Sequence, residues 1–311
     1  MMPSQVRHAM RCATVVAAAL LSSCGGSGES DTPQDSVGSE IAQSVSANTL
    51  AIGPDTVNAN VAVLLTVQAV VAGGQATTTI ACDGGGTARF TASGGNGVSL
   101  LNGVLDAGEH YSMVFDNCRV SDGADSLSGL MSIDVISASA NELTLQTSTQ
   151  GIVVARPHRT LTLNGSSTIS QSSVTNGATV TTTNRWVSPQ IALTSLHNGN
   201  LSSLTLSNVD LTTTSTTVGG VPAGSTSSGT LTITVAWPGM SWSATITTQG
   251  PASFDVNGVA IEGSWLMTLP HDRIGLVVAA DLATVTLDNG ANGSIDHTFF
   301  FGVLALLAAA A

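Results

Sequence analysis

Aliphatic residues alternate with serine and threonine along most of the chain after Ala76, as in TLTLNGSSTIS, GTLTITVAW and WSATITT. Successive side chains of a β-strand point to opposite faces, so this alternation predicts strands with one apolar and one hydroxyl-bearing face. Asn-Gly pairs, which suit tight hairpin turns, begin at Asn96, Asn102, Asn164, Asn176, Asn198, Asn257, Asn289 and Asn292. The pattern predicts an all-β, mainly antiparallel fold of consecutive hairpins.

The expected number of strands is about 13 to 16, more than an open twisted sheet usually carries without curling or splitting. A sandwich, a strongly curved half-barrel and a closed barrel all fit this number. A transmembrane barrel is disfavoured because it needs aromatic girdles, and 4% of the residues are aromatic. We expect a single β-rich domain at 54–311, built as a large curved sheet, half-barrel or sandwich with one N-terminal helix packed on it.

The expected helix covers residues 56–72, with Asp55 as its N-cap and Gly73 after its end. The segment is apolar on most faces, so a pair of buried strands is the alternative interpretation. Its length without a turn signal favours the helix, which must then be buried. At the other end of the chain, TFFFGVLALLAAAA is too short to span a membrane and is interpreted as a last buried strand with a frayed tail.

The N-terminus has the layout of a signal peptide. Arg7 and Arg11 precede the short run of small and apolar residues from Ala13 to Leu21. The run ends at Leu21-Ser22-Ser23-Cys24, which resembles the lipobox of bacterial lipoprotein precursors. The resemblance implies that residues 1–23 are removed and that diacylglycerol and a further acyl chain, such as palmitate, are attached to Cys24.

Gly25 follows the lipobox cysteine, where an aspartate would imply retention at the inner membrane. The resemblance therefore implies a lipid-anchored protein of the outer membrane, on its periplasmic or its cell-surface face. Residues 24–53 are polar and weakly patterned, and we interpret them as a flexible linker between the lipid and the folded domain.

The chain is acidic, with a formal net charge of −12, and its eight basic residues are all arginine. Nucleic acids and anionic membrane surfaces attract basic patches, so neither is an expected partner. Catalysis that needs a lysine is excluded. The short basic cluster Arg156-Pro157-His158-Arg159 could meet a phosphate group, but a solvated turn is the preferred interpretation.

Cys82 and Cys118 are the thiols that remain after signal removal and lipidation, and in an exported chain we expect them to form a structural disulfide. The surrounding segments CDGGGTARF and LDAGEHYSMVFDNC resemble a Cys-x-Gly-Gly and Phe-x-Asn-Cys pattern of uncharacterised proteobacterial exported β-rich proteins. This resemblance implies no activity.

Two loops match parts of the twelve-residue calcium loop, which needs oxygen ligands at positions 1, 3, 5 and 12. Asn102, Asp106 and Glu109 match the rear half of such a loop, and Asp288, Asn292 and Asp296 match a second, incomplete one. Plain Asn-Gly turns are the preferred interpretation of both loops. A calcium-stabilised surface module is a weaker alternative, and no other cofactor is expected.

No catalytic motif is found: the chain has neither a Gly-x-Ser-x-Gly elbow nor a His-Glu-x-x-His helix motif. Glu109-His110 and His271-Asp272 place an acid beside an imidazole, but strand neighbours point to opposite faces. We expect a non-catalytic protein with a structural or binding role in the cell envelope. The alternative is a carrier that holds a lipid on the concave face of its sheet; an envelope protein is the other expected partner.

Overall fold

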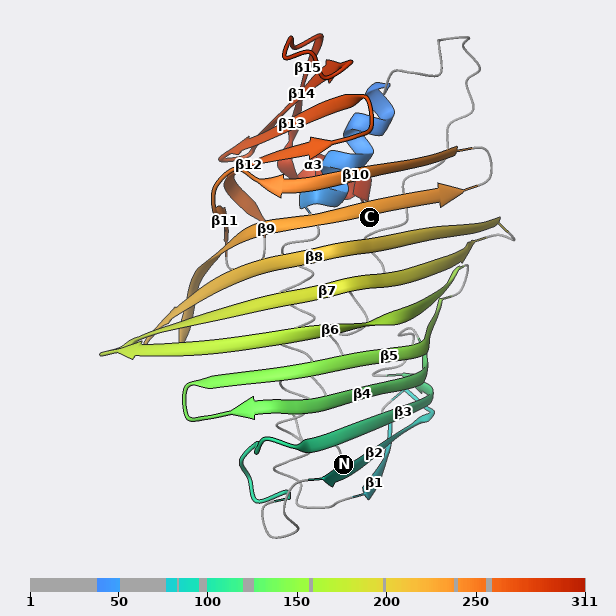
Figure 1. The fold of residues 1–311 in the computed structure, drawn as a ribbon, viewed down its shortest axis with the longest axis vertical. Coiled ribbons are helices and arrows are strands. Elements are labelled where there is room, and N and C mark those ends of the chain that lie inside the picture. The colour runs from blue at the N-terminus through green and yellow to red at the C-terminus, as the bar shows by residue number, and fades with distance from the viewer. Residues whose placement is uncertain are drawn as a thin grey trace.

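The computed structural model describes residues 38–50, 77–82, 84–94, 100–119, 126–156, 159–197, 200–237, 240–255 and 259–310. Their strands form one antiparallel sheet of fifteen strands (Figure 1). The bounds are β1 Thr77–Ala81, β2 Thr87–Gly94, β3 Glu109–Arg119, β4 Ser126–Ala138, β5 Glu142–Arg156, β6 Arg159–Asn176, β7 Thr179–His197, β8 Asn200–Val218, β9 Val221–Trp237, β10 Met240–Thr248, β11 Ala252–Phe254, β12 Ala260–Thr268, β13 Asp272–Ala279, β14 Leu282–Asn289 and β15 His297–Gly302.

Nearly every strand pairs with the next strand along the chain, so the sheet is a long meander. The exception is β11, which lies beside the main path and pairs with β9 and β12. Among the described strands, β1 pairs with β2 alone and β15 with β14 alone, and these two ends lie far apart in Figure 1. The described strands therefore form an open sheet, neither a sandwich nor a closed barrel. The all-β expectation and the expected number of strands are confirmed.

The Asn-Gly pairs, which were predicted to form hairpin turns, lie in different kinds of structure. Asn176 ends β6 at the hairpin to β7, and Asn289 ends β14 before the loop to β15. Asn164 instead lies inside β6, where its Oδ1 accepts a hydrogen bond of 2.7 Å from the Gly151 backbone N–H at an irregularity of β5. Turns at Asn102 and Asn292 lie in longer loops. Asn96, Asn198 and Asn257 lie outside the described residues.

Register shifts interrupt the ladders of β3 to β9 at several points. Such bulges bend a strand and increase its twist. The longest strands, β6, β7 and β8, with 18, 19 and 19 residues, lie at the middle of the sheet. Beyond them, β9 to β15 curve around a helix, as Figure 1 shows. The fold is therefore a single curved sheet with a helix in its concavity.

The helix found in this concavity covers residues 39–50, where the sequence predicted flexible linker; for these residues that interpretation is wrong. Ile41, Ala42, Val45 and Thr49 follow the spacing of a helical face. Serine and asparagine between them obscured this pattern. The expected helix at 56–72 lies outside the described residues.

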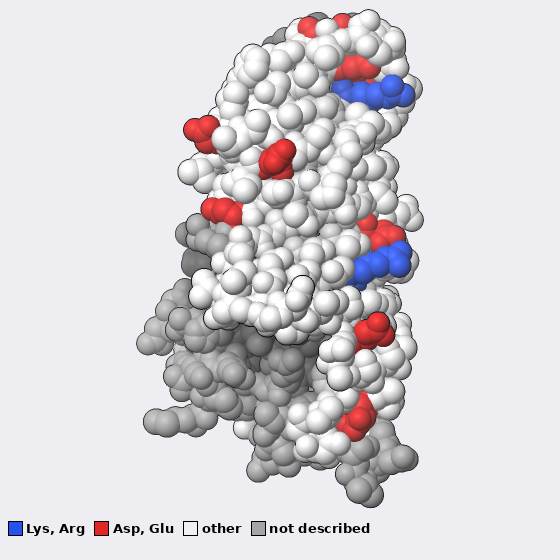
Figure 2. All heavy atoms as spheres, turned by 90° about the vertical axis from the view of Figure 1, so that its left-hand side faces the viewer, with Lys and Arg blue, Asp and Glu red and all other residues white. Residues whose placement is uncertain are grey.

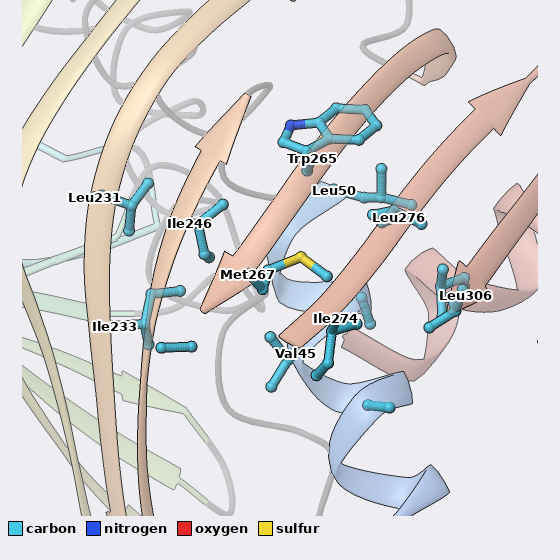
Figure 3. Close-up of a cluster of buried hydrophobic side chains, with 14 of the residues drawn as sticks. Val45, Leu50, Leu231, Ile233, Ile246, Trp265, Met267, Ile274, Leu276 and Leu306 are labelled. Carbon is cyan, nitrogen blue, oxygen red and sulfur yellow. The ribbon is translucent and has the colours of Figure 1, made fainter. Parts of the chain in front are cut away.

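The helix completes the larger of two hydrophobic cores. Figure 3 shows Val45 and Leu50 of the helix among Met267, Ile274 and Leu276 of the sheet. Buried residues of β8 to β14 complete this core, together with Val303 and Leu306 of α3, Val303–Ala310. The predicted last strand is present as β15, but it is exposed to half-buried rather than buried, and the residues after it form α3 rather than a frayed tail. No helix of the described residues has the length and apolar content to cross a membrane.

The smaller core lies under β2 to β5 and contains Phe90, Tyr111, Ile133 and both cysteines of the disulfide. The inner face of β5 to β8, between the two cores, carries polar residues that are almost fully buried, such as Thr147, Asn184 and Thr213. Two apolar clusters are thus joined through a polar middle section.

The outer face carries the hydroxyl residues that the alternation predicted. Cross-strand hydroxyl pairs join β9 and β10: Thr230 with Thr247 at 3.2 Å, Thr232 with Thr245 at 3.1 Å and Thr234 with Ser243 at 2.9 Å. Charged side chains are sparse and scattered in the view of Figure 2. The cross-strand hydroxyl pairs make the outer face of β9 and β10 polar.

Candidate functional site

The Cys82–Cys118 disulfide is present, with a Cα–Cα distance of 5.4 Å. It links the end of β1 to β3, and both residues are buried. Gly86 has a steric role, because its φ is +76° and a Cβ at this position would clash with the Asn117 carbonyl oxygen. Asn117 itself has a φ of 47° at the register shift before Cys118. The motif thus builds a bulged, cross-linked corner, which is a structural role.

The loop before β3 brings Asn102, Asp106 and Glu109 together, as the calcium prediction required. Glu109 is 1% exposed, and its Oε2 accepts hydrogen bonds from the Asp106 backbone N–H at 2.9 Å and from the Tyr111 hydroxyl at 2.8 Å. Asn102 donates from Nδ2 to Asp106 at 3.0 Å and accepts from the Val104 N–H at 2.8 Å. The side-chain oxygens of Glu109, Asp106 and Asn102 therefore accept hydrogen bonds from within the loop and its neighbouring strand.

Burial raises the pKa of the Tyr111 phenol well above its ordinary value, and the hydrogen bond to Glu109 and the negative charges of Glu109 and Asp106 raise it further. Tyr111 is thus a neutral hydrogen-bond donor at physiological pH. The other carboxylate oxygen of Glu109, Oε1, is buried without a hydrogen-bond partner. An unpaired buried oxygen destabilises the fold. The hydrogen bonds of Glu109 that hold the loop are therefore accompanied by a loss of folding free energy at Oε1.

The second predicted calcium loop follows β14. Asp288 accepts hydrogen bonds from the backbone N–H groups of Asn292 and Gly293, both at 2.9 Å. Asp296 accepts from the Asn289 N–H at 2.7 Å, and Asn292 accepts from the Ser294 N–H at 2.8 Å. The side-chain oxygens proposed as ligands bind the loop's own backbone. No group of three or more His, Cys, Asp and Glu that could hold a metal ion occurs among the described residues.

The two acid–imidazole neighbours point apart, as expected for strands. Glu109 is buried, whereas His110 lies on the outer face, where its Nδ1 is 2.6 Å from Asp134 Oδ1 of β4. Asp272 is buried and His271 is exposed. The sequence missed the pair of His110 with Asp134, because a register that joins residues 24 apart is set by the preceding bulges and turns.

A cleft of about 240 Å³ lies between the loop before β3, the β4–β5 turn and β6. Gly103, Val104 and Leu105 line it from the loop, and Glu142 and Leu143 line it from the start of β5. Gln171 and Ser173 of β6 also line it. Sequence reasoning missed this cleft, because its three walls are far apart along the chain. The Asn102-Gly103 pair predicted a turn in one of these walls, the loop before β3.

Two predicted positions are not described. The lipidation site Cys24 lies outside the described residues, and nothing is described of the side chains in the Arg156–Arg159 cluster. Comparison of the chain with protein-family models, with curated proteins and with solved structures gave no match.

Proposed function

We propose that this protein is a lipid-anchored protein of the bacterial outer membrane with a non-catalytic structural or binding role in the cell envelope. The observation that carries the proposal is the lipobox-like segment that ends at Cys24. It lies upstream of a domain that is cross-linked by a buried disulfide. Disulfides persist in oxidising compartments such as the periplasm. Both features thus favour an exported protein.

The curved sheet supports a structural or binding role better than a lipid carrier. A carrier needs a concave apolar site, and ligand sites of about 300 to 1,000 Å³ are usual. In this fold, residues 39–50 and α3 fill the concavity of β9 to β14 with buried side chains. The cleft beside Glu142 is smaller, at about 240 Å³, and partly polar. We therefore do not propose lipid transport.

The anchor is tested by replacing Cys24 with serine in the full chain, expressed in a Gram-negative host with an alkyne analogue of palmitate. Wild type and a matched Cys12→Ser control are expected to incorporate the label and to sediment with outer-membrane vesicles. The Cys24→Ser variant is expected to lose both properties. Equal labelling of wild type and Cys24→Ser would overturn the proposal. Protease treatment of whole cells then distinguishes the periplasmic from the cell-surface face.

A further inference from the structure

The connection between β2 and β3 is much longer than a hairpin requires. β2 ends at Gly94 and β3 begins at Glu109, whereas hairpin loops usually have two to five residues. A connection of this length is uncommon in a compact domain, where such connections are usually either functional or disordered. The described part of the loop, from Leu100 onward, forms one wall of the 240 Å³ cleft.

This wall is held by a chain of hydrogen bonds that starts in the smaller core. Buried Glu109 binds Tyr111 and the Asp106 backbone, Asp106 binds Asn102, and Asn102 binds the backbone of Val104. The chain ends at an apolar side chain that is 62% exposed. The hydrogen bonds hold the loop backbone at Val104 and leave its side chain exposed beside the cleft.

The β4–β5 turn contributes Glu142, an exposed acidic residue whose backbone is held by hydrogen bonds. Glu142 begins β5, and its backbone N–H donates to Ser139 Oγ at 3.1 Å while its carbonyl accepts from the Ser139 N–H at 2.7 Å. The Ser173 N–H donates to the Asn141 carbonyl at 2.9 Å and ties this turn to β6. Among the described residues, no cation pairs with the Glu142 carboxylate. It is free to bind a charge from outside.

The lining limits the chemistry of a ligand. Among the described residues that line the cleft, Glu142 is the charged one, and none is an arginine or a histidine. Leu105, Leu143 and Val104 supply apolar surface, and Gln171 and Ser173 supply hydrogen-bonding groups. An anion would be repelled by Glu142, whereas an ammonium group beside it would form a charge-assisted hydrogen bond. The volume restricts the ligand to a small molecule.

We infer that this cleft binds a small organic cation, with an ammonium group on Glu142 and an apolar body between Val104, Leu105 and Leu143. Glu109 and Asn102 are then positioning residues for the wall that covers the apolar body. This inference gives a ligand class to the binding role proposed above. It does not depend on the lipid anchor, so failure of either proposal can be distinguished from failure of the other.

The test is isothermal titration calorimetry on the purified full-length protein in detergent, with three probes of matched size: n-butylamine, 1-butanol and butyrate. We expect saturable binding of n-butylamine that weakens as salt is added, and at least tenfold weaker binding of 1-butanol and butyrate. Glu142→Gln keeps the shape of the side chain and removes its charge, and it should weaken n-butylamine binding about tenfold or more. Glu262→Gln, an exposed carboxylate on β12, is the matched control and should bind as wild type does.

Asn102→Ala tests the wall separately from the charge. This substitution should weaken the binding of n-butylamine severalfold. The salt dependence of binding should stay unchanged, because the Glu142 carboxylate remains. The melting temperature of each variant is measured to show that it is folded. The inference is wrong if n-butylamine shows no saturable binding, if 1-butanol or butyrate binds as well, or if Glu142→Gln binds like wild type. If Glu142→Gln and Glu262→Gln weaken n-butylamine binding equally, the effect comes from the overall negative charge of the protein rather than from the cleft. That result would also overturn the inference.

Discussion

Arg185 of β7 donates two hydrogen bonds to the Asp210 carboxylate of β8, from Nε at 2.8 Å and from Nη2 at 2.7 Å. The pair lies on the outer face, and both side chains are substantially exposed. Hydrogen bonding to Arg185 lowers the pKa of the Asp210 carboxyl below its ordinary value of 3.8. Exposed ion pairs contribute little to stability, so the pair is better detected by titration than by unfolding.

We expect Arg185→Ala to raise the pKa of Asp210 towards its ordinary value, because the charged form loses its hydrogen-bond donors. The measurement is a carbon-13 NMR titration of the carboxyl group. The small stabilisation from the pair is present above the ordinary pKa and is lost as the pH falls through the lowered value. Arg273→Ala, on β13, is the control and should leave Asp210 unchanged. An unchanged pKa of Asp210 in Arg185→Ala would contradict the pairing.

At the scale of elements, two features shape the molecule: the bulges that bend the strands and the helix that fills their concavity. Gly229 of β9 lies where the register with β8 shifts, at a φ of +144°. A Cβ at this position would clash with the Asp210 carbonyl oxygen and lie 2.9 Å from Leu211 Cα. The close approach of β8 and β9 at this point thus needs a glycine.

Gly229→Ala is expected to lower the free energy of unfolding by about 1 to 3 kcal/mol, because both the clash and the backbone angle strain the folded state. Urea unfolding followed by circular dichroism measures this change. Gly250→Ala provides the comparison, since its added Cβ meets no atom within 4 Å. If both variants unfold at the same urea concentration, the close approach of β8 and β9 at Gly229 is not as described.

Leu50→Ala tests whether the helix at residues 39–50 belongs to the fold. Leu50 is 1% exposed in the larger core, and a buried Leu→Ala change costs about 2 to 5 kcal/mol. Leu304→Ala in α3, where the side chain is 69% exposed, should change stability by less than about 0.5 kcal/mol. Equal urea midpoints for the two variants would restore the linker interpretation.

At the scale of the whole molecule, two apolar cores are carried by one sheet and separated by a polar inner face. The smaller core has fewer buried residues and contains the disulfide. Regions with fewer buried contacts open more readily. The disulfide therefore stabilises the end of the sheet that has less hydrophobic burial.

Replacing both Cys82 and Cys118 by serine is expected to destabilise the protein by up to about 4 kcal/mol, since a cross-link over 36 residues restricts the unfolded chain. Hydrogen exchange followed by mass spectrometry should show the largest loss of protection in β1 to β4. Strands β12 to β14 in the same sample serve as the internal reference. A uniform loss along the whole sheet would mean that the two cores unfold as one unit.

The sequence by itself determined the fold class, the hairpin order and the disulfide. Period-two alternation decides which face of a strand is apolar, and the hypothesis of an exported chain predicted that Cys82 and Cys118 would pair. It did not determine the sheet's shape. Curvature depends on register shifts such as those at Cys118 and Asp210, which arise from cross-strand pairing rather than from local preference.

The tertiary structure also decided which polar segments are buried. Residues 39–50 resemble linker in composition, and their helix is stabilised by a concave apolar surface made more than 150 residues later in the chain. Asn102, Asp106 and Glu109 were recognised as oxygen-bearing residues of one loop, but their partners decide their role. Their cleft requires β4, β5 and β6 to be folded against that loop, so local sequence could not reveal it.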